Sequence, residues 1–166
     1  EYLAVVPTEP AVQTLLLGQG FEPMTTVYQF ILPTKSAAEL AAGLTGLLPG
    51  KDATADLLNR RGQADLDRID RVTRNITREA DHVFWLKERQ LRAAFVQQGA
   101  RIAAYAYGGA EQVGPVAGST QDAALAALGW ALDLAIDAGA SGTIELRIPS
   151  PFRSAVEALL ETEARL

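Results

Sequence analysis

Apolar residues along the chain follow two spacings, and these predict an alternation of strands and helices. Continuous apolar or β-branched runs are typical of buried strands. The strand-like segments are residues 3–6, 26–32, 91–96, 101–107, 112–117 and 143–148. A glycine-containing turn joins residues 91–96 to residues 101–107, which predicts an antiparallel hairpin.

Helical spacing covers most of the remaining chain. The predicted helices span residues 11–17, a short stretch before Pro49, residues 64–86, a stretch from Ser119 to before Gly139, and residues 152–166. Ser36 with Glu39 and Ser119 with Asp122 form capping-box patterns, which predict helix starts at both serines.

Residues 64–86 carry the clearest amphipathic pattern, with a break expected near Asp81. The predicted apolar stripe consists of Leu66, Ile69, Val72, Ile76 and Val83. The charged residues around it are Asp67, Asp70, Arg71, Arg74 and Arg78. The three arginines could contact a phosphate of a nucleotide, but with the aspartates nearby they are more simply a solvated face with ion pairs within the helix.

The two ends of the chain resemble each other. Residues 2–7 and 11–16 repeat the order of residues 144–149 and 155–160: an apolar run, a proline, a polar turn and a helical stretch. Repeats of this kind mark duplicated supersecondary units. We therefore predict that residues 3–6 and 143–148 are both strands, followed by helices that pack through Leu15-Leu16 and Leu159-Leu160.

Composition narrows the classes of function. The 166 residues are 48% hydrophobic and 21% charged, which is ordinary for a folded domain. A net charge of -5 argues against electrostatic binding of nucleic acid. With no cysteine and one histidine, thiolate catalysis and Cys/His metal sites are excluded, and no metal is expected. No apolar run has the length of a membrane span and no signal peptide is visible, so no membrane association and a cytoplasmic location are expected.

The element order, with a few local motifs, resembles the GNAT N-acetyltransferase superfamily. The motifs lie in residues 20–30, 103–109, 113–117 and 145–149. The resemblance implies an α/β (α+β) fold with a mixed, mostly antiparallel sheet flanked by helices. It also implies that residues 1–32 end a first domain, residues 33–63 are a helical connector, and residues 64–166 form a second domain lacking its last strands.

That division leaves unpaired strand edges, which proteins tend to cover. We therefore expect either that residues 26–32 complete the sheet of the second domain or that two chains form a homodimer through open sheet edges.

The resemblance further implies transfer of an acyl group from acetyl-CoA to an amine, either a small molecule or a protein N-terminus. The pyrophosphate would lie at a helix N-terminus, and the expected cofactor-binding residues are Val116, Ala117, Gly118, Ser119, Thr120 and Gln121. This stretch departs from the family's signature, because it has a single glycine, no arginine, and Asp122 in the first turn. Ser119 and Asp122 also fit an ordinary helix cap.

Catalytic candidates are few. Tyr105 and Tyr107 point to one face of a strand, where one could protonate a departing thiolate, although such tyrosines are more often core or rim residues. His82 is a candidate base or a structural hydrogen-bond partner. The last predicted helix lacks the tyrosine usual in the family. Two functions remain open: an N-acetyltransferase, or a degenerate, non-catalytic GNAT-like domain that serves as a structural or ligand-binding module.

Overall fold

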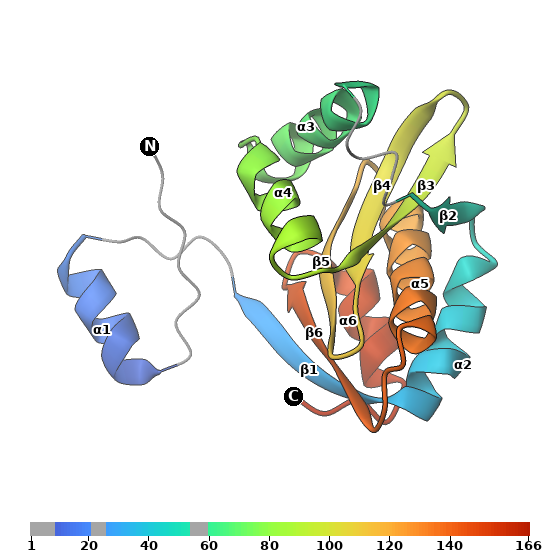
Figure 1. Cartoon of the computed structure of the whole chain (residues 1–166). Helices are drawn as coiled ribbons and strands as arrows, with labels where there is room; N and C mark the ends of the chain where they lie inside the picture. The colour runs from blue at the N-terminus through green and yellow to red at the C-terminus, as the bar shows by residue number, and fades with distance from the viewer. Residues whose placement is uncertain (1–8, 21–25, 54–59) are drawn as a thin grey trace.

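A computed structural model describes residues 9–20, 26–53 and 60–166, and for Arg60 and Arg61 only the backbone. Within them, one open six-stranded sheet has the strand order β1-β6-β5-β4-β3-β2 (Figure 1). The strands are β1 Val27–Pro33, β2 Gly50–Asp52, β3 Arg92–Gln98, β4 Arg101–Gly108, β5 Gln112–Gly118 and β6 Thr143–Pro149. The helices are α1 Pro10–Gly18, α2 Thr34–Thr45, α3 Arg60–Arg74, α4 Glu79–Lys87, α5 Gln121–Asp137 and α6 Arg153–Leu160.

The fold is mixed α/β, and every strand pair in the sheet is antiparallel except β5 with β6. The predicted hairpin is confirmed as β3 and β4, whose turn contains Gly99 at φ 62°. Glycine adopts this left-handed conformation without the strain that a side chain would cause. The predicted strand at residues 3–6 lies outside the described residues.

Strand β1 completes the sheet, as predicted for residues 26–32. It pairs antiparallel with β6 over its whole length, with Phe30 opposite Leu146. Its other edge is bridged at one point, where Ile31 exchanges backbone hydrogen bonds with Arg165. An edge strand offers unpaired N–H and C=O groups, so the bridge shortens the edge that remains open.

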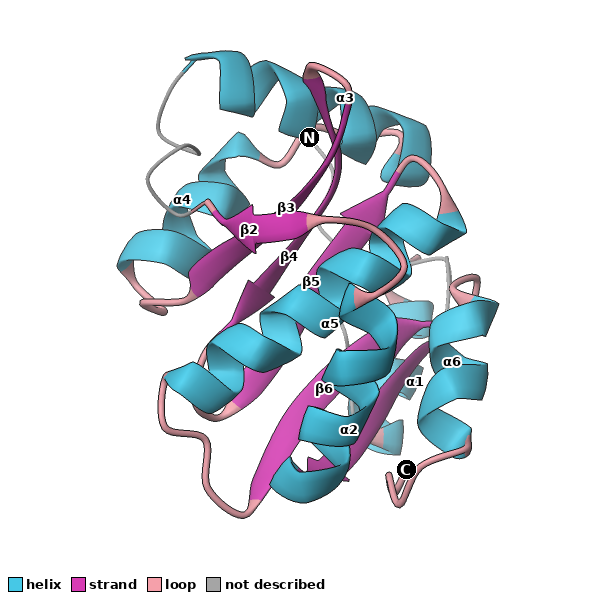
Figure 2. Cartoon of the chain, turned by 90° about the vertical axis from the view of Figure 1, so that its right-hand side faces the viewer, coloured by secondary structure: helices cyan, strands magenta, loops and turns pink. Residues whose placement is uncertain are grey.

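Helices cover both faces of the sheet (Figure 2). Side chains of α2, α5 and α6 form one core cluster with the sheet, and α3 and α4 pack against the opposite face. Helix α5 is alanine-rich and approaches α2 closely at Gly129, where an added Cβ would lie 2.6 Å from the Cβ of Leu44. The resemblance assigns helix α2 and strands β1 and β2 to the first domain and the connector. In the structure β1 and β2 lie in the same sheet as β3 to β6, and α2 and β1 contribute to the same core cluster.

The helix predicted over residues 64–86 is two helices. Helix α3 ends at Arg74, and Asn75, with φ 59°, turns the chain before α4 begins at Glu79. The predicted stripe is correct for Leu66 and Ile69, which are buried, and wrong for Val72, which is 71% exposed. The stripe fails at Val72 because steps of three drift around a helix of 3.6 residues per turn, so Asp70, four residues after Leu66, continues the buried face instead. The break at Asn75 then ends the periodicity of α3.

Both predicted capping boxes are wrong. Helix α2 begins at Thr34, directly after Pro33, and Ser36 is buried inside it, with its hydroxyl donating to Glu163 at 3.5 Å. The cap of α5 is Thr120 rather than Ser119, since the Thr120 hydroxyl accepts from the N–H of Ala123 at 3.2 Å. Adjacent Ser and Thr residues have similar capping preferences, so local sequence does not separate them.

The terminal repeat is confirmed at its second copy and only partly at its first. Strand β6 and helix α6 form as predicted, with Leu159 fully buried. Helix α1 forms, but Leu15, the counterpart of Leu159, is 62% exposed, and α1 contains no buried residue. The prediction that α1 packs through Leu15 is therefore wrong for the described part of the chain. Figure 1 shows α1 standing apart from the sheet.

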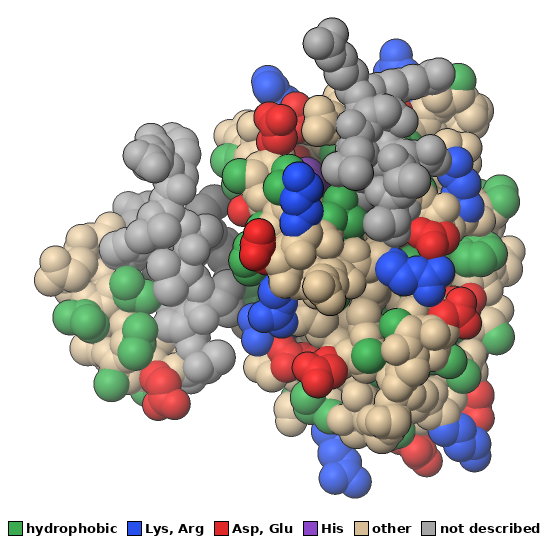
Figure 3. All heavy atoms as spheres, in the orientation of Figure 1, with side chains coloured by type: hydrophobic (Ala, Val, Ile, Leu, Met, Phe, Trp, Pro, Cys, Tyr) green, Lys and Arg blue, Asp and Glu red, His purple; other side chains and the backbone are tan. Residues whose placement is uncertain are grey.

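The lengths of the helices and the charges on the surface are relevant to contact with membranes and nucleic acids. None of the helices described here is long and apolar enough to cross a membrane. Figure 3 shows acidic and basic side chains interspersed over one face of the molecule.

Candidate functional site

A buried polar network connects α3 and α4 to β4. Asp70 accepts a hydrogen bond from the Tyr105 hydroxyl at 2.5 Å through Oδ1. Its Oδ2 lies 2.9 Å from His82 Nε2, and His82 Nδ1 lies 2.7 Å from the Tyr107 hydroxyl. Asp70 and both tyrosines have no exposed surface, and His82 is nearly buried.

The elements position these side chains by ordinary rules. Tyr105 and Tyr107 are two residues apart on β4, so both point to the face that α3 and α4 cover. The turn at Asn75 folds α4 back beside α3, which brings His82 to Asp70. Arg78, in the connection, stacks its guanidinium 4.4 Å from the Trp85 ring centre.

Burial keeps the two tyrosine hydroxyls of the network protonated. Desolvation by burial raises the pKa of Tyr105 and of Tyr107 well above the ordinary tyrosine value of 10.0. The negative charge of Asp70 also raises both pKa values, and the positive charge of Arg74 opposes the rise at Tyr105. Both phenols therefore stay protonated at neutral pH. With its proton on Nε2, His82 donates to Asp70 and accepts from the Tyr107 hydroxyl, a tautomer assigned from the partners.

The structure thus brings together the three catalytic candidates Tyr105, Tyr107 and His82. They surround Asp70, which the sequence pattern assigned to a solvated helix face. Asp70 follows Leu66 and Ile69 at the spacing of a buried helix stripe, a signal that could have identified it. Every member has a hydrogen-bond partner. Satisfied buried networks rigidify a core, so the surroundings favour a structural role for Tyr105, Tyr107 and His82.

Alkaline titration should detect the buried phenols. A tyrosine whose pKa is raised on folding contributes full stability below its unfolded pKa, near 10.0, and that stability is lost as the pH rises further. We expect no tyrosinate absorbance from Tyr105 or Tyr107 around pH 10 until the protein unfolds. The measurement is the difference titration between the wild type and a Tyr105→Phe/Tyr107→Phe variant. A difference signal from folded protein near pH 10 would contradict the buried network.

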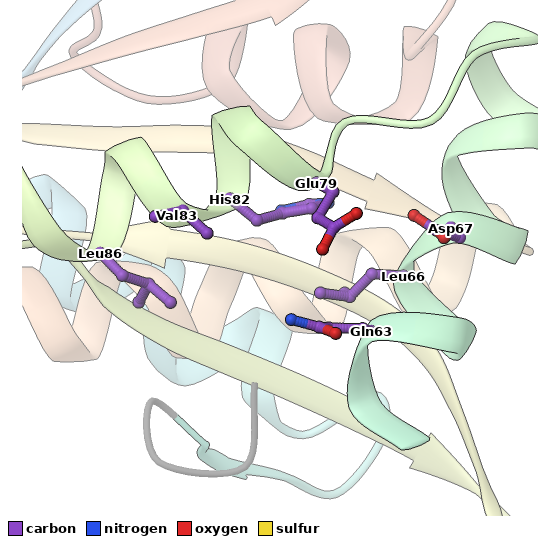
Figure 4. A pocket seen from close by; sticks show the side chains of 7 residues that line it. All are labelled: Gln63, Leu66, Asp67, Glu79, His82, Val83 and Leu86. Carbon is purple, nitrogen blue, oxygen red and sulfur yellow. The ribbon is translucent and has the colours of Figure 1, made fainter. Parts of the chain in front are cut away.

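A small pocket lies beside the network, between α3 and α4 (Figure 4). Its volume is about 20 Å³, and its lining residues are Gln63, Leu66, Asp67, Glu79, His82, Val83 and Leu86. A cavity of this size holds about one water molecule. It is therefore too small for a substrate.

Strand β5 separates from β6 after Val113. Residues 114–118 of β5, which follow the last paired residue, are called the divergence of β5 from β6. Parallel pairing of these strands covers only Gln112 with Glu145 and Val113 with Leu146. Beyond it, Gly114 has φ 116° and Pro115 has no N–H to donate. A parallel pair normally continues with evenly spaced hydrogen bonds, so this strand carries polar groups that β6 does not pair.

Strand alternation identifies those groups. The N–H of Ser119 donates to Ala103 of β4 at 2.8 Å. Because successive residues of a strand alternate in direction, Val116 and Gly118 direct their N–H groups away from β4. The carbonyl of Val116 points the same way, and accepts from Arg74 at 3.1 Å.

The six cofactor-binding candidates all lie where β5 meets α5: Val116, Ala117 and Gly118 end the strand, and Ser119, Thr120 and Gln121 lead into the helix. Gly118 has no room for a side chain, since an added Cβ would lie 2.8 Å from the N of Ala124. The glycine is therefore needed for the close approach of strand and helix.

The donor set at this helix end fits an anion in part. The side chain of Ser119 donates to Ala103 O, and that of Thr120 caps Ala123. In the described structure no acceptor is assigned to the first-turn N–H groups of Gln121 and Asp122. Free amides and the helix dipole favour an anion. The Asp122 carboxylate in the same turn opposes one.

Metals are a separate matter. Within residues 9–20, 26–53 and 60–166, no group of three His, Cys, Asp or Glu side chains is arranged to hold a metal ion.

Comparison with known proteins supplies no identity. No protein-family model matches the chain, and no curated protein matches it. The function must therefore be inferred from the residues and their geometry.

Proposed function

We propose that this chain binds an acyl-CoA and is part of a GNAT-type N-acetyltransferase that acetylates an amine. The observation that carries the proposal is the divergence of β5 from β6 directly before the N-terminus of α5. Strand N–H groups turned away from their neighbour and free amides at a helix N-terminus are the two kinds of donor that such a ligand needs.

Particular residues would hold the ligand. The N–H groups of Val116 and Gly118 are donors for the acyl-bearing arm, and those of Gln121 and Asp122 are donors for the pyrophosphate. Acetyl-CoA supplies an acetyl group activated as a thioester. The neutral amine would form a bond to the thioester carbonyl carbon, and the C–S bond would break, so that CoA leaves as its thiolate. Because the buried network offers no exposed base or acid, water would take the proton from the amine and protonate the thiolate.

The proposal is tested by titrating acetyl-CoA with Asp122→Asn beside the wild type. Removing a negative charge from the first turn should tighten binding by about 1 kcal/mol, the usual scale for a charge at a helix terminus. Calorimetry gives the affinity, and the amides of Gly118 to Gln121 should shift in NMR spectra. The matched control is Asp137→Asn at the other end of α5, which should leave the affinity unchanged. Absence of binding by the wild type would refute the proposal.

A second candidate is a GNAT-like domain that does not catalyse. It is favoured by the loop before α5, where the side chain of Ser119 bonds Ala103 and that of Thr120 caps the helix, while Asp122 repels phosphate. Acetyl-CoA binding without acetylation of small amines or of peptide N-termini would support this candidate and exclude the enzyme.

A further inference from the structure

Arg74 connects the buried network to the divergence of β5 from β6. It lies in the last turn of α3, with its side chain 23% exposed. Its Nη1 lies 3.4 Å from Oδ1 of the fully buried Asp70, and its Nη2 donates to the carbonyl oxygen of Val116 at 3.1 Å. One guanidinium thus bridges a carboxylate on α3 and the backbone of β5.

The contact to Val116 replaces a strand partner. Where parallel strands continue side by side, a carbonyl that points toward the neighbour accepts from its N–H. Val116 is nearly buried, and a buried carbonyl without a partner is costly. Arg74 supplies the donor, so β5 can stay separate from β6 at this residue without an unsatisfied group.

Asp70 and its hydrogen-bond partners fix the position of the Arg74 guanidinium. Asp70 is held by Tyr105 and His82, so it offers Arg74 an anchored counter-charge. A planar guanidinium with a fixed partner loses little freedom when it forms a second hydrogen bond. The chain of contacts from Tyr107 through His82, Asp70 and Arg74 therefore ends on the carbonyl of Val116.

We propose that Arg74 is a positioning residue for the acyl-CoA site: it holds the Val116 carbonyl so that the N–H of the same residue stays available to the ligand. The proposal rests on the proposed function, because the ligand is an acyl-CoA. Arg74 itself is turned to the protein backbone and need not touch the ligand.

The same helix offers a matched control. Arg68 also donates to a strand carbonyl, that of Ile102 in β4, at 2.6 Å. Ile102 and Tyr107 lie near opposite ends of β4, and Ile102 is beside the register shift between β4 and β3. Arg68→Ala and Arg74→Ala therefore each remove one arginine-to-backbone bond from α3, and only the second touches the divergence.

The experiment measures the dissociation constant of acetyl-CoA for the wild type, Arg74→Ala, Arg74→Lys and Arg68→Ala. We expect Arg74→Ala to weaken binding by about tenfold or more, the scale of one charge-assisted hydrogen bond. Arg74→Lys should recover part of the loss, as should guanidinium ion added to Arg74→Ala. Arg68→Ala should stay within about twofold of the wild type. Equal losses from Arg68→Ala and Arg74→Ala would overturn the proposal, as would an unchanged affinity of Arg74→Ala.

A measurement on the free protein separates this proposal from the proposed function. Hydrogen exchange at the amides of Val116 and Gly118 reports local opening of β5. If the wild type binds no acetyl-CoA, the proposed function fails, and hydrogen exchange alone tests the role of Arg74. A change of about tenfold in the exchange rates of these amides in Arg74→Ala, absent in Arg68→Ala, supports the conclusion that Arg74 holds β5 in position. Unchanged exchange rates of these amides in Arg74→Ala refute the positioning role of Arg74. Where Arg74→Ala does not fold, Arg74→Lys takes its place in both comparisons.

Discussion

Replacing Asp70 by alanine should lower the free energy of unfolding by about 3–5 kcal/mol, the cost of removing one partner from a buried charged pair. The change leaves the Tyr105 hydroxyl, His82 Nε2 and the guanidinium of Arg74 without their common acceptor. Tyr105 and His82 lose a bond inside a buried core, so each adds a desolvation penalty, and Arg74 loses its counter-charge. Urea denaturation of the variant and the wild type measures the difference.

The control for this experiment lies on the same helix. Asp67 is half-buried at the rim of the small pocket beside the network. Asp67→Ala should change the free energy of unfolding by no more than about 0.5 kcal/mol, as at surface positions. Equal losses from Asp67→Ala and Asp70→Ala would mean that the network does not stabilise the packing of α3 on the sheet.

Replacing Leu159 by alanine should lower the free energy of unfolding by about 2–5 kcal/mol, the range for a buried leucine that leaves a cavity. Leu159 is fully buried in the core cluster that α6 shares with α5 and β6. Thermal or urea denaturation provides the measurement.

Leu160 and Leu15 provide two controls. Leu160 follows on α6 and is 57% exposed, and Leu15 occupies the repeat position of Leu159 on α1. Both alanine variants should lie within about 0.5 kcal/mol of the wild type. A large loss from Leu15→Ala would mean that α1 packs as α6 does, and that the repeat extends to its tertiary contacts.

Most of the secondary structure could be predicted from local sequence patterns. Residues 26–32 and 143–148 form strands because β-branched and apolar runs pack well only on a pleated surface. The alternation of a strand also put Tyr105 and Tyr107 on one face. These are local properties, which neighbouring residues set and which a pattern therefore reveals.

The burial of particular polar residues depends on contacts between distant parts of the chain. Arg74 and Val116 are separated by 42 positions, and Asp70 and Tyr105 by 35, so no periodicity relates them. A charged residue on an amphipathic helix is usually solvated. Asp70 is fully buried and Arg74 is only partly exposed, because the turn at Asn75 and the packing of β4 and β5 bring partners to them. The hydrogen-bonded chain and the divergence of β5 from β6 arise from such long-range contacts, which the folded backbone alone creates.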